Sequence, residues 1–158
     1  MMTRRSFLLR GTVGMAVFSI GERFMLGAQK FEVTKSDAEW RKILTADQYA
    51  VLRHEATEPP FSSPLDKEKR RGTFVCAGCG LQLFSSTTKF DSGTGWPSFW
   101  APLENAVGET RDLSLGVVRI AVHCRRCGGH LGHVFDDGPK PTGLRYCMNG
   151  VAMVFKPS

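Results

Sequence analysis

Two Cys-x-x-Cys pairs constrain the fold of this chain more than any other feature of its sequence. Cys76 and Cys79 form the first pair, Cys124 and Cys127 form the second, and residues 80–123 separate them. Two residues between cysteines allow both sulfurs to bind one ion from a tight turn, and two such pairs complete the tetrahedral four-thiolate shell of structural zinc. The sequence therefore predicts one structural Zn²⁺ that joins two distant segments.

Other interpretations of the two pairs are disulfides, redox-active dithiols and an iron–sulfur cluster. Disulfides are common in exported proteins. However, a bridge inside Cys-x-x-Cys closes a very small loop and adds little stability, unless it is redox-active as in thioredoxin-like proteins. An iron–sulfur cluster also takes four thiolates, but nothing else in the sequence indicates electron transfer. Zinc is the interpretation we favour.

The charge of the chain does not favour a nucleic-acid partner. The 158 residues suit one domain, and 42% hydrophobic with 23% charged residues excludes a disordered or collagen-like chain. Half of the net charge of +6 comes from residues 1–28, which hold four arginines and one glutamate. The mild excess that remains is not the clustered basic face that nucleic acids require.

Residues 1–28 are predicted to be an export signal. Arg4 and Arg5 stand ahead of a short apolar run, Gly11–Ile20, which is shorter than the about 20 residues of a transmembrane helix. Paired arginines before such a run resemble a bacterial twin-arginine signal. We expect a periplasmic domain over residues 29–158 that meets the membrane only during export. A basic tail on a cytosolic protein and a retained anchor are the alternatives.

Residues 31–58 have a helical pattern. A capping box at Ser36 and Glu39 predicts the start of one short helix, and a second one follows from Thr45. The apolar positions with helical spacing are Trp40, Ile43 and Leu44 in the first helix and Tyr49 and Leu52 in the second. Prolines from Pro59 onward end the helical part.

After Arg71 the pattern changes to short strands. The predicted strands are rich in β-branched and aromatic residues and are bounded by Gly, Pro or Asp; they are 73–75, 81–84, 117–122, 131–135 and 151–155. Strands do not alternate with helices here, so the sheet should be antiparallel. The predicted fold class is mainly β, with short N-terminal helices.

Cys147 is the fifth cysteine and has no partner in the two pairs. A free cysteine is most often a small buried apolar residue. On a strand, however, Arg145 and Asn149 would share a face with Cys147, and a neighbouring cation lowers the pKa of a thiol. A cation, a thiol and an amide in one row indicate a catalytic site.

Two histidines, His130 and His133, are candidates for proton transfer near neutral pH. They could instead be metal ligands, although four thiolates already complete the shell, or polar residues of a turn. His54 and His123 have no comparable neighbours and are taken as structural.

Aromatic residues follow a glycine-rich turn at residues 92–100. Trp96 and Phe99 are large apolar side chains that could cover the core or line a pocket for a sulfur-bearing methyl group, because sulfur packs favourably on aromatic rings.

Taken together, these motifs resemble the B-type methionine sulfoxide reductases, which reduce the R epimer of methionine sulfoxide. The resemblance covers roughly residues 36–155. It rests on Cys-Ala-Gly-Cys-Gly from Cys76, Ser-Gly-Thr-Gly-Trp-Pro-Ser-Phe from Ser92, His-Leu-Gly-His-Val-Phe from His130, Asp-Gly-Pro from Asp137 and Arg-Tyr-Cys-Met-Asn from Arg145.

The resemblance implies a β-tent-like fold of two antiparallel sheets with peripheral helices and one structural zinc. It makes Cys147 the nucleophile, which becomes a sulfenic acid when it reduces the substrate, an oxidised protein or peptide. The other site residues that it implies are His130, His133, Asp137, Arg145 and Asn149 for catalysis, and Trp96 and Phe99 for substrate binding.

One position departs from a common pattern of this family. Many members carry a resolving cysteine between the two glycines of the Gly-x-Gly-Trp motif, where this chain has Thr94. With four cysteines assigned to zinc and one to chemistry, none is left to resolve the sulfenic acid. We therefore expect a one-cysteine variant that uses an external thiol reductant, thioredoxin-like or other.

Two other classes of protein fit parts of the sequence. A zinc-ribbon module that binds protein or nucleic acid would account for the cysteine pairs, but it needs neither a reactive thiol nor paired histidines. A thiol peroxidase could also use Cys147, and turnover of peroxide would distinguish it from a sulfoxide reductase.

Overall fold

The computed structural model describes residues 30–158, and the predicted export signal lies outside this range. Within it, no helix has both the length and the apolar character needed to cross a membrane.

Two short helices, α1 (Asp37–Ile43) and α2 (Ala46–His54), come first in the described part, and the predicted capping box of α1 is confirmed. The predicted helix start at Thr45 is confirmed too, and Thr45 and Gln48 form a second capping box there. Trp40 and Leu44 of the first apolar face are buried, as are Tyr49 and Leu52 of the second. The prediction for Ile43 is wrong, because this last residue of α1 is 54% exposed. Trp40 and Leu44 are four residues apart and lie on the same side of the helix, so these two side chains cover the core and Ile43 does not.

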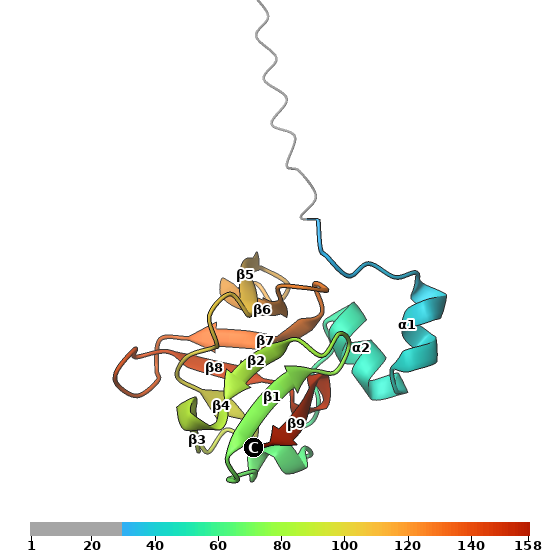
Figure 1. The fold of residues 1–158 in the computed structure, drawn as a ribbon. Coiled ribbons are helices and arrows are strands. Elements are labelled where there is room, and N and C mark those ends of the chain that lie inside the picture. The colour runs from blue at the N-terminus through green and yellow to red at the C-terminus, as the bar shows by residue number, and fades with distance from the viewer. Residues whose placement is uncertain (1–29) are drawn as a thin grey trace, which may run out of the picture.

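Nine strands form two antiparallel sheets in the described residues, as predicted (Figure 1). The smaller sheet has the order β2-β1-β9, with β1 (Gly72–Cys76), β2 (Gln82–Ser85) and β9 (Met153–Pro157). The larger sheet has the order β3-β4-β8-β7-β6-β5. Its strands are β3 (Lys89–Phe90), β4 (Ser98–Phe99), β5 (Val107–Asp112), β6 (Arg119–Cys124), β7 (His130–Phe135) and β8 (Arg145–Met148).

Three phenyl rings in contact join the two sheets in the core. Phe99 of β4 stacks on Phe84 of β2, with ring centroids 4.4 Å apart, and meets Phe74 of β1 edge to face at 4.9 Å. Burial of each ring stabilises the fold by about 2 kcal/mol. Because Phe99 is 0% exposed, the prediction that it lines a substrate pocket is wrong.

The register of the larger sheet places several polar side chains on one face. Cys147 of β8 lies opposite His133 of β7 on one side and Ser98 of β4 on the other. The same row continues through Ala121 of β6 to Thr110 of β5. Since side chains alternate along a strand, residues directly opposite share a face. We call this face of the larger sheet the thiol face.

Candidate active site and metal centre

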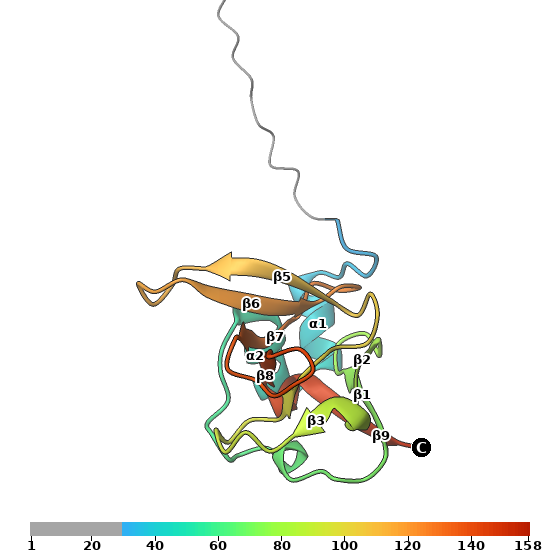
Figure 2. The same cartoon turned by 90° about the vertical axis from the view of Figure 1, so that its left-hand side faces the viewer.

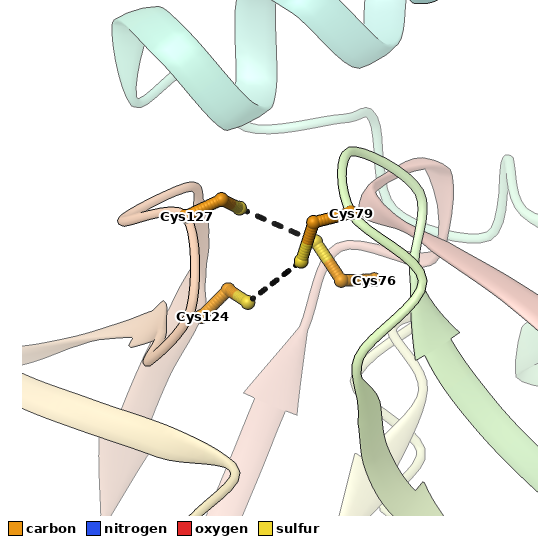
Figure 3. Close-up of side chains that lie close together, drawn as sticks. All are labelled: Cys76, Cys79, Cys124 and Cys127. Atoms are coloured by element: carbon orange, nitrogen blue, oxygen red, sulfur yellow. Dashed lines mark hydrogen bonds between the residues drawn. The ribbon is translucent and has the colours of Figure 1, made fainter. Parts of the chain in front are cut away.

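The four paired cysteines form one cluster between the two sheets. Cys76 is the last residue of β1 and Cys79 follows it, while Cys124 is the last residue of β6 and Cys127 follows it (Figure 3). The sulfurs of Cys76 and Cys127 are 3.7 Å apart, those of Cys79 and Cys124 are 3.5 Å apart, and all four lie within 4.8 Å of one another.

These distances fit a tetrahedral metal shell. Four sulfurs at about 2.3 Å from a zinc ion stand about 3.8 Å from each other, whereas a disulfide bond is about 2.05 Å long. All five cysteines are free in the structure. Contacts among the four sulfurs raise the pKa of Cys76 and Cys127 and lower that of Cys79 and Cys124. Four thiolates this close require a cation, and the donor set is consistent with structural zinc.

Cys147 lies apart from this cluster, on the thiol face. Its sulfur is 3.9 Å from Thr94 Oγ1, so the residue at the position of the family's resolving cysteine lies next to it. Burial raises the pKa of Cys147 above its usual value, while Thr94, Arg145 and Ser98 lower it in part. Arg145 acts in the predicted direction and lowers the pKa of Cys147, but burial outweighs it.

Arg145 and Asp137 form a two-pronged ion pair beside Cys147. Arg145 Nε and Nη2 donate to the two carboxylate oxygens of Asp137, each at 2.8 Å. The guanidinium also lies 4.5 Å above the ring of Phe135. This pair holds the pKa of Asp137 below its usual range and fixes Arg145 at the edge of the thiol face.

His133 is paired with a carboxylate that the sequence analysis did not identify. His133 Nε2 lies 2.8 Å from Asp112 Oδ2, and Arg119 Nη2 donates to the same oxygen. Hydrogen bonds from the backbone and hydroxyl of Ser114, and from His133, hold the pKa of Asp112 well below its usual range. An ionised carboxylate only accepts hydrogen bonds, so Nε2 of His133 carries its proton and Nδ1 is the ring atom left for a substrate.

His130 is deeply buried beside His133, with ring centroids 5.4 Å apart. It is 4% exposed, and burial, with His133, lowers its pKa to about 4. His130 is therefore neutral at physiological pH. His123, taken as structural from the sequence, lies opposite His130 in the sheet and is also buried. His54 packs on Tyr49 of its own helix and is not part of this group.

Asn149 does not continue the row of Cys147 and Arg145. Strand β8 ends at Met148, so the alternation of side chains stops there. The amide of Asn149 donates to the carbonyl of Leu131 at 3.0 Å, and its oxygen accepts from the backbone N–H of Glu58 at 2.9 Å. Both ends of this side chain thus hold the loop of Glu58 against β7.

Glu58, also missed from the sequence, joins the predicted substrate residue Trp96 to the segment after Cys147. The indole N–H of Trp96 donates to the carbonyl of Glu58 at 3.1 Å. The buried carboxylate of Glu58 accepts from the backbone N–H groups of Gly150 at 2.6 Å and Val151 at 2.8 Å. Its position in a proline-rich loop gave no periodic pattern that could have indicated this role.

These two centres, a metal-type cysteine cluster and a separate thiol with its own histidine and arginine, are the layout expected of an enzyme that uses a cysteine on a β-sheet scaffold. Comparison with known proteins agrees: the family described as the SelR domain matches residues 44–157. The chain belongs to the SelR family, that of the B-type methionine sulfoxide reductases, and is an oxidoreductase.

Curated relatives cover most of the chain. The peptide methionine sulfoxide reductase MsrB of Bradyrhizobium diazoefficiens is 57% identical over 127 residues, which are 80% of this chain and 91% of that protein. The proteins of the same description from Leptospira interrogans and Methanosarcina barkeri are 52% and 55% identical. They cover 80% and 82% of this chain, and 97% and 91% of their own lengths.

Proposed function

We propose that this protein reduces the R epimer of peptide-bound methionine sulfoxide, with Cys147 as nucleophile and an external thiol as reductant. The observation that carries the proposal is the thiol face, where Cys147 and His133 stand directly opposite on neighbouring strands. Family membership supplies the reaction, and this geometry supplies a nucleophile and a proton carrier for it.

The first half-reaction balances without an added proton. The sulfur of Cys147 forms a bond to the sulfoxide sulfur, and the sulfoxide oxygen takes up the thiol proton by way of His133 Nδ1. The resulting hydroxyl passes to the sulfur of Cys147, and the bond between the sulfurs breaks with its electron pair left on methionine. Cys147 becomes a sulfenic acid, oxidised by two electrons, and the sulfoxide is reduced by two.

The side chains around the thiol have separate tasks in this scheme. Arg145, held by Asp137, stabilises the thiolate as it forms. His130 is neutral and buried beside His133, so it places no second positive charge next to an imidazolium at His133. Trp96, fixed through its indole N–H, is the candidate surface for the S-methyl group.

The sulfenic acid is reduced by two external thiols in turn. The first forms a mixed disulfide with Cys147 and releases water, and the second releases the free thiol of Cys147. Support for an external reductant is that Thr94 occupies the neighbouring position and that the other four cysteines form the metal-type cluster. We propose a structural zinc in that cluster, which would hold β1 and β6 together.

We further propose that the protein is exported by the twin-arginine route and repairs oxidised periplasmic proteins. The support is the Arg4-Arg5 pair before an apolar run. Replacement of both arginines by lysine should leave the protein in the cytoplasm, as measured by fractionation. Unchanged export of that variant would contradict this location.

A single-turnover assay tests the proposed chemistry. The purified protein and its Cys147→Ser variant are each mixed, in separate reactions and without reductant, with the R epimer and with the S epimer of a methionine sulfoxide peptide. Any sulfenic acid that forms is trapped with dimedone. We expect one methionine per chain from the R epimer alone, dimedone on Cys147, and no product from the variant. Turnover by the variant, or of the S epimer, would refute the proposal.

A further inference from the structure

The turn between β5 and β6 carries an exposed apolar surface that the proposed chemistry does not use. Residues 113–118, here called the apolar tip, hold four aliphatic side chains whose exposure ranges from 58% at Val118 to 68% at Leu115. They are four of the seven large apolar side chains that are exposed within residues 30–158. The sequence of the tip, Leu-Ser-Leu-Gly-Val-Val, contains no charged residue.

The apolar tip is a closed turn and not a loose loop. Gly116 N–H donates to the carbonyl of Leu113 at 3.1 Å, and Gly116 has a φ of +74°, which favours glycine. Ser114 N–H donates to Asp112 Oδ1 at 2.8 Å. The β5–β6 hairpin projects beyond the rest of the fold (Figure 2), and the exposed side chains of the tip stand at its end.

The carboxylate of Asp112 connects the apolar tip to the thiol face. Asp112 bonds the tip through Oδ1, to Ser114 N–H, and bonds His133 through Oδ2. The tip is therefore attached to the candidate active site by one side chain.

A polypeptide bound at Cys147 can reach the apolar tip. Strand β6 is two strands away from β8 and β5 is three strands away, so the middle of the hairpin lies about 12 Å from β8, at about 4.8 Å per strand. Ala121 of β6 belongs to the row of Cys147, and the tip lies about 13 Å further along the strand direction than Ala121. The separation is thus about 18 Å, which an extended chain spans with about five residues.

The chemistry of a methionine-containing polypeptide suits this surface. An unfolded polypeptide exposes apolar side chains that a folded protein buries, and an uncharged aliphatic surface can bind them. The tip exposes on the order of 400 Å² of apolar surface, about half of what each partner buries in a stable protein complex. A weak, reversible contact with a substrate fits this area better than a permanent dimer.

We propose that the apolar tip binds apolar side chains of the polypeptide substrate, about five residues away from the methionine sulfoxide that is held at Cys147. This inference rests on the proposed function and adds to it a surface that selects polypeptides over the free amino acid and selects among their sequences.

The test compares three substrates. One is a small molecule, N-acetyl-methionine-R-sulfoxide methylamide. The others are two unfolded peptides that differ only in whether leucine and valine or serine stand about five residues on either side of the sulfoxide. The tip variant carries Leu113→Ser, Leu115→Ser, Val117→Thr and Val118→Thr, and the control variant carries Ile43→Ser and Val154→Thr, which are exposed apolar residues elsewhere. Circular dichroism verifies that each variant is folded.

We expect the unmodified protein and the control variant to prefer the apolar peptide about tenfold in kcat/KM. The tip variant should treat both peptides alike and keep the full rate on the small substrate. A preference that survives in the tip variant, or that the unmodified protein lacks, would overturn the inference. Inactivity of the unmodified protein on every substrate would instead refute the proposed function.

Two further outcomes would assign the tip to another partner. Sedimentation of the unmodified protein, but not of the tip variant, with vesicles of phosphatidylglycerol and phosphatidylethanolamine would indicate a membrane surface. A dimer that the tip variant cannot form would indicate a second copy of the chain. Either result, combined with equal rates on both peptides, overturns the substrate-binding role.

Discussion

Asp112 on the edge strand β5 accepts a hydrogen bond from His133 on β7, with 2.8 Å between Oδ2 and Nε2, although 20 residues separate them along the chain (113–132). Arg119 and Ser114 hold the carboxylate in place from two further directions. The pair fixes the tautomer and the orientation of the His133 ring. Asp112 acts through His133 and is therefore a positioning residue.

Replacement of Asp112 by Asn should lower kcat for sulfoxide reduction by about 100-fold, with a smaller effect on KM. The amide can turn an N–H towards Nε2 in place of the accepting oxygen, so the His133 ring loses the bond that fixes its tautomer and orientation. The matched control is Asp136→Asn. Asp136 is an exposed residue directly after β7, and its side chain forms no hydrogen bond or ion pair with any residue that the structure describes. A lower free energy of unfolding in Asp112→Asn with an unchanged kcat would show that this carboxylate only stabilises the hairpin.

The hydrogen bond between Asp112 and His133 is an example of a contact that could not be predicted from the sequence. Motifs close in the chain were sufficient for the helix starts and for the approximate positions of five of the nine strands in the described residues, and the cysteine spacing was sufficient for the cluster. Strand β5, Val-Gly-Glu-Thr-Arg-Asp, was missed because an edge strand with polar side chains lacks the apolar alternation of a half-buried strand. Asp112 therefore could not be placed opposite any other residue.

Local spacing also failed at residues whose side chains turn away from their neighbours. Phe99 lies in the aromatic loop but points into the core, whereas the small Ser98 faces Cys147. Asn149 follows the period of β8 in sequence but lies beyond its last residue. In both cases the tertiary contact decides the direction of the side chain.

Cys147 should react more slowly with alkylating agents at neutral pH than a typical free cysteine. Burial keeps its pKa above the usual value, so little thiolate is present. The rate of iodoacetamide alkylation against pH should have a midpoint above that of glutathione, and Arg145→Met should raise the midpoint further, since Arg145 lowers this pKa. Cys147→Ser provides the background from the metal-type cluster. A midpoint below that of glutathione would indicate a thiolate that is stabilised in the free protein.

His130 should make the fold less stable in acid. Its pKa is about 4 in the folded protein and about 6.5 in an unfolded chain. The unfolded state therefore binds more protons between these values, and the free energy of unfolding falls as pH drops from 6.5 towards 4, by up to about 3 kcal/mol. Urea unfolding at several pH values gives the free energy of unfolding as a function of pH. The slope of this free energy between about pH 4 and pH 6.5 should be smaller in His130→Gln than in the unmodified protein. Because the cysteine cluster adds the same acid sensitivity to both proteins, equal slopes would mean that His130 is not buried as a neutral ring.

Loss of the metal should unfold the region where the two sheets meet. A four-thiolate site forms only in the folded chain, so its binding energy adds to the free energy of folding. We expect about one zinc per chain by metal analysis, and a Tm lower by about 10 °C or more in Cys124→Ser. Cys147→Ser should keep both the metal and the Tm. A zinc content well below one per chain in the folded protein would remove the zinc assignment.

Glu58 should couple stability to substrate binding. Its carboxylate bonds the backbone after Cys147, while its own backbone bonds Trp96 and Asn149. Glu58→Gln leaves one acceptor oxygen for two backbone donors, and the buried N–H without a partner costs about 1–3 kcal/mol of the free energy of unfolding.

The same substitution loosens the loop that holds the indole of Trp96, so KM for a sulfoxide peptide should rise more than kcat falls. Urea unfolding and steady-state kinetics measure the two effects, with Glu55→Gln as control, since Glu55 is exposed at the end of α2. A loss of stability with unchanged KM would show that Trp96 is positioned without Glu58. Equal behaviour of the two variants would show that the carboxylate of Glu58 contributes to neither.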